Sequence, residues 1–339
     1  MLIIGLEGQT LEAADRARIS APQVCGVILF SRNFADRDQV TTLIDDIRGE
    51  RGDPFIVCVD QEGGPVQRFR DGFSALPPLA RLGELHDRDP RAAVARAEEH
   101  AWLMASEMRA IGVDLSFAPV LDLARGNRAI GERAFHADPQ VVSELAQGYL
   151  RGMRLAGMAA TIKHFPGHGS VAEDTHFDDA VDPRPLEELL AADLVPFADA
   201  IASGAEAVMM AHVAYPAVDA RPAGYSRIWI EDVLRGELGF RGLVFGDDIG
   251  MAAAGSVGGM AARIEAHLLA GCDLLLACSP AIVDEAIRAC AQALPCDSAR
   301  LASLQGEVAQ TWDALARNPQ RDEFASRLAA LGAPTDGLT

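Results

Sequence analysis

Short, nearly continuous apolar runs recur along the chain, and longer stretches of helical character separate them. Eight runs stand out, at residues 2–6, 26–30, 55–59, 113–117, 158–162, 207–210, 243–245 and 272–277. A run that is short and apolar at successive positions is typical of a parallel strand buried on both faces. The chain is therefore expected to contain eight buried parallel strands.

The segments between the runs carry helix signals, and helices are expected at residues 91–110, 139–155, 186–203 and 260–270. Asp138 and Pro139 are typical of an N-cap and a first helical position, and Gly204 and Gly271 follow the ends of the last two helices. Eight strands alternating with helices predict an α/β fold, a single-domain (β/α)8 barrel. The alternative is an open doubly wound sheet, but no GxGxxG follows the first run.

No linker and no shift in composition divides the chain, and its 339 residues are 49% hydrophobic, ample for a large core. Residues 1–339 are therefore expected to form one catalytic barrel domain. Residues 61–90, rich in Gly, Pro and Arg, are interpreted as a long loop at the barrel mouth. From about residue 291 to residue 339 a helical tail with a frayed end is expected.

Charge and cysteine content narrow the possible partners. A net charge of −19 repels phosphate backbones and anionic lipid, so neither nucleic acid nor a membrane is expected to bind. The first residues lack an export signal, and no apolar run is long enough to span a bilayer. The six cysteines match no zinc or CxxC spacing, which indicates reduced core residues of a cytoplasmic protein without metal or cofactor. No assembly element is evident, so a monomer is expected.

Charged and imidazole groups follow five consecutive apolar runs. The carboxyl ends of barrel strands share one rim, where barrel enzymes keep their active sites, so these groups are expected to meet there. They are Asp60 and Arg68 after the third run, Asp122, Arg133 and His136 after the fourth, Lys163 and His164 after the fifth, His212 after the sixth, and Asp247 and Asp248 after the seventh.

Some of these residues could have a structural role instead of a role in the active site. Asp60 could cap a turn, Arg133 could form a surface ion pair, and His212 could satisfy a buried backbone group rather than line the site. Asp122 is expected to be structural. Of Asp247 and Asp248, at most one is expected to point into the mouth, because neighbouring side chains on a strand diverge.

The segment after the fifth run is the most informative part of the chain. Residues 163–176 place one lysine, three histidines and one aspartate within fourteen positions, ending in Asp174 and His176. Pro166, Gly167 and Gly169 oppose a regular helix or strand. A loop this rich in titratable groups, at the carboxyl end of a strand, is typical of the catalytic loops of α/β enzymes.

These motifs resemble glycoside hydrolase family 3, and specifically its single-domain bacterial β-N-acetylglucosaminidases of cell-wall recycling. The resemblance covers roughly residues 3–280. Its most specific element is the sequence KHFPGHG at residues 163–169 with Asp174 and His176. Residues 59–64 with Arg68, and residues 117–122, 130–135 and 245–251, are also similar to that family.

The resemblance implies a retaining mechanism in which Asp247 is the nucleophile and His176, oriented by Asp174, is the acid/base. It implies terminal N-acetylglucosamine as the bound sugar and cell-wall (anhydro)muropeptides as substrates. The sugar ligands that it implies are Asp60, Arg68, Arg133, Lys163 and His164. Two positions depart from the family pattern, because Gly246 and Gly250 stand where the family usually has serine.

The chemistry is consistent with these residue types. Most retaining glycosidases use two carboxyl groups, one as nucleophile and one as acid/base. Larger members of the family take the acid/base from a second domain, for which this chain has no room, so a barrel loop must supply the proton. An unperturbed histidine has a pKa of ~6.5 and can donate and then accept a proton at neutral pH. Gly167 and Gly169 are expected to let the loop close over the sugar.

Three alternatives remain open. A metal-dependent amidohydrolase is also a barrel with histidines at strand ends, but it needs several histidines that converge on a metal, and residues 2–7 offer none. A sugar-binding barrel that lost turnover through Gly246 and Gly250 is the second. Phosphorolysis instead of hydrolysis is the third, because a neutral histidine repels phosphate less than a carboxylate would.

Overall fold

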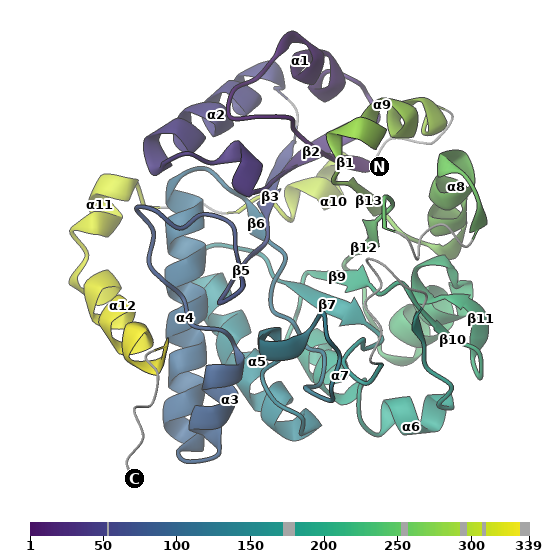
Figure 1. Ribbon diagram of the computed structural model, residues 1–339. Coiled ribbons are helices and arrows are strands. Elements are labelled where there is room, and N and C mark those ends of the chain that lie inside the picture. The colour runs from purple at the N-terminus through teal and green to yellow at the C-terminus, as the bar shows by residue number, and fades with distance from the viewer. Residues whose placement is uncertain (53, 172–179, 252–256, 292–296, 307–309, 333–339) are drawn as a thin grey trace.

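The computed structural model describes residues 1–339 except 53, 172–179, 252–256, 292–296, 307–309 and 333–339. In that part of the chain, eight parallel strands form one sheet in the order β6-β3-β2-β1-β13-β12-β9-β7. The sheet curls into a barrel with helices on its outside (Figure 1). The segment that follows the edge strand β6 meets the other edge strand, β7, at a parallel bridge between Val120 and Lys163. The predicted α/β fold of the (β/α)8 barrel type is confirmed.

Each strand of the barrel is followed along the chain by helical structure on the outside. The strands are β1 (Leu2–Gly5), β2 (Val24–Leu29), β3 (Ile56–Val59), β6 (Leu115–Ser116), β7 (Thr161–Phe165), β9 (Ala207–Met210), β12 (Leu243–Asp248) and β13 (Leu274–Ala277). The covering helices are α1 (Ala13–Ile19), α2 (Arg37–Glu50), α4 (Pro90–Ala110), α5 (Pro139–Leu155), α6 (Leu186–Leu190), α7 (Val195–Ala202), the π-helix η4 (Ile228–Glu237), α8 (Met260–Ala270) and α9 (Pro280–Ala289).

Two strands extend beyond the apolar runs that predicted them. β7 begins at Thr161 instead of residue 158, so Lys163 and His164 lie inside the strand and not after it. β12 continues through Asp247 to Asp248. Apolar patterning misses these strand ends because they carry charged side chains. The Lys163 ammonium, for example, is buried beside the carboxylates of Asp60 and Glu62, which a local pattern does not contain.

The helix signals were mostly reliable. The carboxylate of Asp138 accepts a hydrogen bond from the Gln140 N–H at 2.8 Å and caps α5, and α8 ends at Gly271 with a φ of 111°. The predicted helix at residues 186–203 is wrong in one respect, because it is two helices, α6 and α7. Pro196 lies in the first turn of α7, and a proline there cannot continue a helix from α6.

Apolar side chains fill the barrel as well as the space between the barrel and the helices. Inside the barrel, Ile3, Ile28 and Cys58 are almost completely buried. The rings of Phe117 and Phe245 meet edge to face in the same cluster, with centroids 5.2 Å apart. The barrel is thus a packed core, and a binding site can form only at its ends.

The segment predicted as a long loop at residues 61–90 contains regular structure. It begins with the antiparallel pair β4 (Gln61–Gly63) and β5 (Val66–Gln67) and ends with α3 (Ala80–His86). The tight connection between β4 and β5 depends on Gly63 and Gly64, whose φ angles are 100° and 53°. The segment therefore extends directly from β3 as an ordered part of the barrel mouth.

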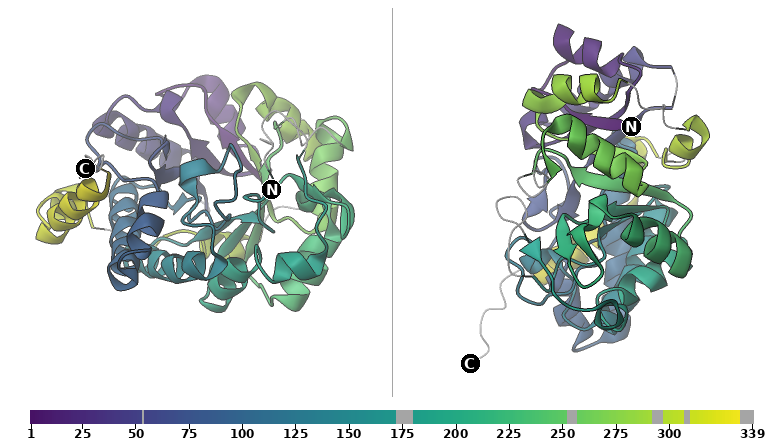
Figure 2. Two further views of the ribbon diagram at one scale, coloured as in Figure 1. Left: turned by 60° about the horizontal axis from the view of Figure 1, so that its bottom comes forward. Right: turned by 90° about the vertical axis from the view of Figure 1, so that its right-hand side faces the viewer.

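Three helices close the described part of the C-terminal region, α10 (Ser298–Ala302), α11 (Trp312–Ala316) and α12 (Pro319–Gly332). Figures 1 and 2 show α12 on the outside of α4. Trp312 packs edge-on against Phe73, with ring centroids 5.3 Å apart, and the Arg37 guanidinium lies 4.7 Å from the Trp312 ring centroid. The C-terminal helices thus support the mouth segment from outside.

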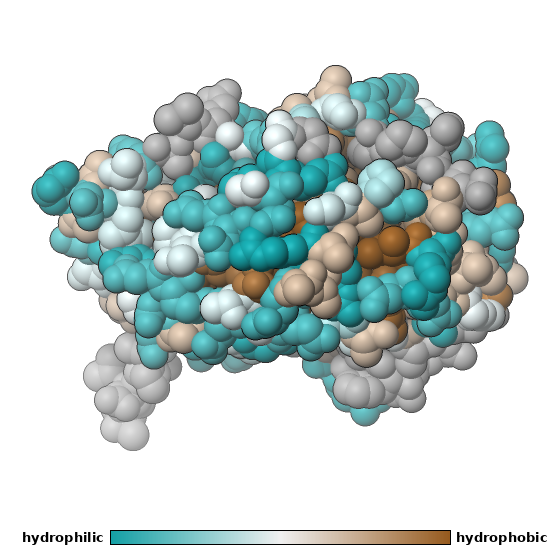
Figure 3. All heavy atoms as spheres, turned by 90° about the horizontal axis from the view of Figure 1, so that it is seen from above, coloured by the Kyte–Doolittle hydropathy of each residue, from teal (hydrophilic) through white to brown (hydrophobic). Residues whose placement is uncertain are grey.

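The face of the molecule seen in Figure 3 is mainly hydrophilic, in keeping with the acidic composition. Large exposed apolar side chains are scattered, with Leu155 and Leu269 the most exposed at 68% and 72%. Among the described residues, none of the helices combines the length and the apolar character needed to cross a bilayer.

Candidate active site

A cavity of about 620 Å³ lies at the carboxyl ends of the barrel strands. Most of the predicted sugar ligands and the predicted nucleophile line it. The polar lining residues include Asp60, Glu62, Arg68, Arg128, Glu132, Arg133, Lys163, His164, Asp247 and Asp248, and the apolar ones include Ile28, Phe30, Met209, Met251 and Leu276. Its size lies within the range typical of small-molecule sites.

One side of the cavity is a network of buried charges. The Lys163 ammonium lies 2.9 Å from an Asp60 carboxylate oxygen and 2.6 Å from a Glu62 oxygen. The Arg133 guanidinium donates two hydrogen bonds to the Glu62 carboxylate, both at 2.8 Å. Arg68 adds an ion pair with Asp60 at 3.6 Å. Three cations and two anions therefore hold one another in place before any ligand arrives.

Glu62 is the centre of this network and is 2% exposed. Burial alone raises the pKa of a carboxyl group, but the charges of Arg133 and Lys163 outweigh that effect and hold the pKa of Glu62 well below its ordinary value. The same pairing raises the pKa of Arg133 against the effect of burial. Glu62 and Arg133 therefore stay charged throughout the physiological range.

Glu62 was not among the predicted site residues, although a local signal for it exists. Asp60 and Glu62 are two positions apart in an extended segment that continues β3 into β4. Side chains two positions apart on a strand lie on the same face. The spacing places both carboxylates toward the cavity, and the strand pattern around Asp60 was enough to find Glu62.

His164 is fixed by a buried aspartate. Its ring Nδ1 lies 2.7 Å from a carboxylate oxygen of Asp122, which is fully buried. The other oxygen of Asp122 accepts hydrogen bonds from the backbone N–H groups of His164 and His168, at 3.3 and 2.6 Å. Burial raises the pKa of Asp122, but His164 and the hydrogen bonds outweigh it and lower that pKa. An ionised Asp122 accepts the Nδ1–H, which leaves the His164 Nε2 for the cavity. Asp122 is structural, as predicted.

The start of the histidine-rich loop is anchored to the barrel wall. His168 is buried and its Nδ1 lies 2.8 Å from the side-chain nitrogen of Asn127, and burial lowers the pKa of His168. Gly169 packs so closely on Leu123 that a Cβ would lie 1.9 Å from the Leu123 carbonyl oxygen. The Tyr215 hydroxyl donates to the Gly167 carbonyl oxygen at 2.5 Å. Both glycines therefore lie where the base of the loop packs closely on the barrel wall.

Asp174 and His176, the predicted acid/base pair, lie outside the described residues, and no geometry is assigned to them.

Asp247 and Asp248 end β12 at the opposite side of the cavity, and both line it. The strand alternation behind the expectation of a single carboxylate in the mouth does not hold here, because β12 is bulged. Gly246 pairs with Leu275 and Asp248 pairs with Leu276, so Asp247 is an extra residue and simple alternation fails.

The two carboxylates have different environments. One oxygen of Asp248 accepts hydrogen bonds from the backbone N–H groups of Gly250 and Cys278, each at 3.1 Å. Burial raises the pKa of Asp248. An oxygen of Asp247 accepts the backbone N–H of Asp248 at 2.7 Å. Asp248 thus fastens β12 to the residue that follows β13, whereas this hydrogen bond of Asp247 is local.

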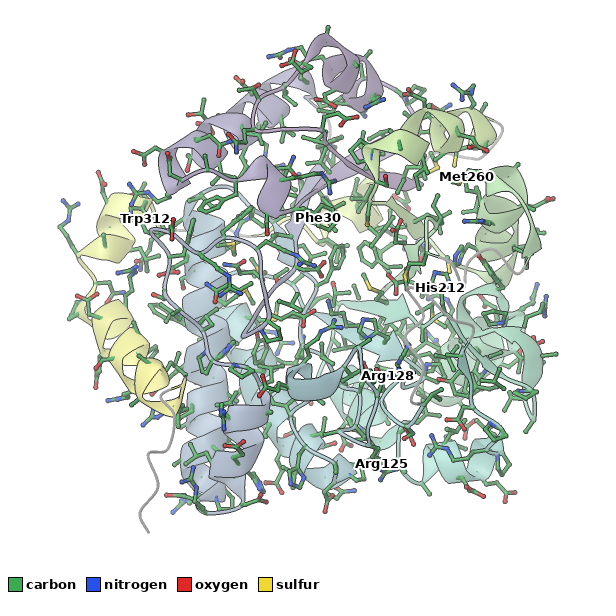
Figure 4. The ribbon with its side chains drawn as sticks, in the orientation of Figure 1. Phe30, Arg125, Arg128, His212, Met260 and Trp312 are labelled. Atoms are coloured by element: carbon green, nitrogen blue, oxygen red, sulfur yellow. The ribbon has the colours of Figure 1, made fainter. Side chains whose placement is uncertain are left out.

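His212 does not line the cavity. It is 2% exposed and packs with Tyr225 and His267, at ring-centroid distances of 5.9 and 5.5 Å, and Figure 4 shows it on the α8 side of the barrel. Burial lowers the pKa of His212 although the charges of Asp247 and Asp248 act in the other direction. Met209, from the strand that precedes His212, lines the cavity in its place. A direct sugar contact is therefore not assigned to His212.

The arrangement offers a carboxylate facing a rigid set of donors and acceptors across a cavity with an apolar part of its wall. Such a site suits a ring that carries several hydroxyl groups on one side and C–H groups on the other. Among the described residues, no three His, Cys, Asp or Glu side chains are grouped so that they could hold a metal ion.

Comparison with known proteins agrees with the geometry. Residues 4–309 match the glycosyl hydrolase family 3 N-terminal domain. The chain is 58% identical over 328 residues to a β-hexosaminidase of Stenotrophomonas maltophilia (strain R551-3), covering 97% of this chain and 98% of the other.

Solved structures give the same result. The chain superposes on the crystal structure of NagZ from Neisseria gonorrhoeae in complex with N-trifluoroacetyl-D-glucosamine, with a TM-score of 0.91, 37% identity and 98% of both chains covered. A β-N-acetylhexosaminidase from Beutenbergia cavernae superposes with a TM-score of 0.78 and 31% identity, covering 98% of this chain and 96% of the other.

Proposed function

Since this chain belongs to glycosyl hydrolase family 3 and is a β-N-acetylhexosaminidase, we propose that it removes terminal, non-reducing N-acetylglucosamine with retention of configuration. Asp247 attacks the anomeric carbon and forms a glycosyl-enzyme. His176, oriented by Asp174, protonates the leaving oxygen and then deprotonates water. The observation that carries this proposal is the convergence of Asp247 with the Asp60–Lys163–Glu62–Arg133 network on one cavity.

The charge network recognises the sugar hydroxyls in this mechanism. Asp60 is held by Lys163 and Arg68, so its remaining lone pairs have fixed directions and accept hydroxyl protons from a sugar of matching stereochemistry. The Nε2 of His164 accepts or donates to a neighbouring hydroxyl, because Asp122 fixes its tautomer. A network with fixed geometry discriminates against an epimer, whose hydroxyl leaves a buried partner unsatisfied.

His176 is favoured as the proton donor because the other histidines of its loop have different tasks. His164 is bound to Asp122, and His168 is buried against Asn127. Neither can leave its partner without the loss of a buried hydrogen bond. We assign the acid/base role to His176 and the tautomer-fixing role to Asp174 on this ground and on the family motif.

The natural substrate in this proposal is a cell-wall (anhydro)muropeptide, and the enzyme acts as a monomer in the cytoplasm. The cysteines of the described residues support a reducing location, because Cys25, Cys58, Cys272, Cys278 and Cys290 are free and all but Cys278 are buried.

The test is covalent trapping. A 2-deoxy-2-fluoro glycosyl donor slows turnover of the intermediate, and mass spectrometry of peptides then locates the sugar. We expect the label on Asp247, with none on an Asp247→Ala variant. A label on Asp248, or turnover of para-nitrophenyl N-acetylglucosaminide with no trapped intermediate, contradicts the assignment. Absence of any turnover supports the alternative of a sugar-binding barrel.

A further inference from the structure

A histidine that the proposed mechanism does not use fills the space behind the nucleophile. His267 lies on α8 and is fully buried. A Cβ on Gly246, the residue before Asp247, would lie 2.9 Å from the His267 Nδ1 and 3.0 Å from its Cε1. A Cβ on Gly224, in the short helix η3 (Ala223–Tyr225), would lie 2.8 Å from the same Cε1. The imidazole therefore occupies a slot that exists because both positions lack a side chain.

The ring cannot easily leave this slot. Its Nδ1 lies 2.9 Å from the Gly224 carbonyl oxygen, which only accepts, so Nδ1 carries the proton. Tyr225 packs on it with ring centroids 4.4 Å apart, and His212 lies on another side at 5.5 Å. Burial lowers the pKa of His267 to about 3. The ring is thus a neutral, pinned block at neutral pH.

The His267 ring packs against β12 at the bulge of that strand. Gly246 pairs with Leu275 of β13 on one side, and the register breaks directly after it. The Leu275 methyl group that also approaches Gly246 is the end of a flexible side chain. The His267 ring is the less yielding neighbour, because it is bonded to Gly224 and packed on both sides. Its position therefore limits how far β12 can move toward α8, one residue before Asp247.

We propose that His267 is a positioning residue for the reaction: through its contact with Gly246 it sets the location of the Asp247 carboxylate relative to the sugar. This inference rests on the proposed function, in which Asp247 is the nucleophile. Gly246 and His267 then act as a coupled pair. A side chain at position 246 displaces the nucleophile only while the imidazole is present, and removal of the imidazole relieves the displacement.

The test is a double-mutant cycle with Gly246→Ala, His267→Ala and the combined variant. The matched control is Gly49→Ala on α2, where a Cβ meets nothing within 4 Å. The readouts are the rate of covalent labelling of Asp247, kcat and KM for aryl N-acetylglucosaminides, and Tm. Gly246→Ala is expected to slow labelling and kcat on the order of 10²-fold, the effect of a displacement of roughly 1 Å. His267→Ala is expected to lose about 10-fold in kcat, because the carboxylate keeps its bonds but gains freedom.

The combined variant shows whether the effects of Gly246→Ala and His267→Ala on the labelling rate depend on each other or simply add. It is expected to label about 10-fold faster than Gly246→Ala, although it also lacks the imidazole. KM should stay close to wild type in all variants, since the proposed sugar ligands Asp60, Lys163 and His164 are unchanged. A general loss of packing would instead lower Tm without this split between kcat and KM.

Each outcome decides the inference. A Gly246→Ala variant as fast as Gly49→Ala, or a combined variant as slow as Gly246→Ala, overturns it. If Gly246→Ala does not fold, His267→Ala alone carries the test, and an unchanged kcat overturns the positioning role. If the wild-type enzyme is labelled at a residue other than Asp247, the proposed nucleophile is wrong. If Asp247 is labelled at the same rate in the wild type and in Gly246→Ala, the nucleophile stands and only the positioning role of His267 is wrong.

Discussion

The two sides of the cavity are built on opposite principles. The recognition wall, made of Asp60, Glu62, Arg133 and Lys163, consists of buried and partly buried charges that neutralise one another. The nucleophile wall, made of Gly246, Asp247, Asp248 and His267, consists of a bulged strand packed against a neutral imidazole. In the recognition wall, the paired charges fix the directions in which the side chains donate and accept hydrogen bonds. In the nucleophile wall, packing against His267 fixes the position of the backbone beside Asp247. A glycosidase needs direction to choose its sugar and position to attack it.

The strongest way to break this comparison is to remove the proposed nucleophile. Asp247→Ala should lower kcat by at least about 10⁴-fold, because no other group supplies the covalent step. Steady-state assays with an activated aryl N-acetylglucosaminide measure this loss. Asp248→Asn is the matched control and should lose much less, because the amide oxygen can still accept from Gly250 and Cys278. Equal losses in the two variants would contradict the division of roles.

Glu62→Gln breaks the recognition wall at its centre. It leaves Arg133 and Lys163 buried without their shared anion, so kcat/KM should fall on the order of 10²- to 10³-fold. The free energy of unfolding should fall by about 3–5 kcal/mol at pH 7. Kinetics and urea denaturation measure the two effects. Glu144→Gln, at an exposed pair with His86, is the control and should change little.

Wild type and Glu62→Gln can also be compared as a function of pH. The pKa of Glu62 in the folded state lies below its ordinary value of 4.5, so its stabilisation is complete above that pH and is lost as pH falls through the folded-state pKa. The difference in unfolding free energy between wild type and Glu62→Gln should therefore be constant near neutral pH and shrink below pH 4.5. A difference that grows on acidification would refute the charge network as its cause.

Asp122→Asn should have a moderate effect on recognition. The amide can present its N–H₂ to the His164 Nδ1, which favours the tautomer with its proton on Nε2. A loss of about 10- to 100-fold in kcat/KM is expected, in line with other residues that orient a histidine. Aryl glycosides that lack single hydroxyl groups measure which contact is lost. A uniform loss across that series would place the effect outside His164.

The smallest expected effect comes from outside the cavity. Trp312→Ala removes the ring that packs on Phe73 and under Arg37, next to the mouth segment that carries Arg68. A partly buried aromatic ring should contribute about 2 kcal/mol to stability, with only a few-fold rise in KM. Thermal unfolding and steady-state kinetics test this. Leu155→Ala, at a side chain that is 68% exposed, is the control. A normal KM with a lowered Tm would show that support of the mouth segment does not reach the recognition wall.

The barrel could be predicted because buried parallel strands are apolar at successive positions, as in β9, whose predicted limits agree with the structure. The ends of β7 and β12 could not be predicted, because each strand includes charged residues, Lys163 in β7 and Asp247 in β12, which an apolar pattern leaves out. The bulge at Asp247 depends on the pairing of β12 with β13, and sequence alternation contains no information on register.

Some of the site residues could likewise be predicted from the sequence, and others could not. Asp60, Arg68, Arg133, Lys163, His164 and Asp247 were found from their places after strands and from the family motifs, and they line the cavity. Glu62 was missed although its spacing from Asp60 was informative. His212 was expected at the cavity because it follows a strand, but its burial against Tyr225 and His267 depends on α8 and η3. His267 carries no signal of its own, since a histidine in an amphipathic helix is ordinary until Gly246 and Gly224 are seen beside it.

Lys163 also has a structural role, which depends on its backbone and not on its charge. Its backbone N–H donates to the Pro119 carbonyl at 3.2 Å, and its carbonyl accepts from the Leu121 N–H at 2.7 Å, so this residue fastens the first edge of the sheet to the last. The same amino acid thus joins the two edges of the sheet and lines the cavity with its side chain. Occupancy by N-acetylglucosamine should consequently slow hydrogen exchange at the seam amides of Leu121 and Lys163 more than at the β1–β2 seam, because a ligand that holds Lys163 resists the parting of the two edges.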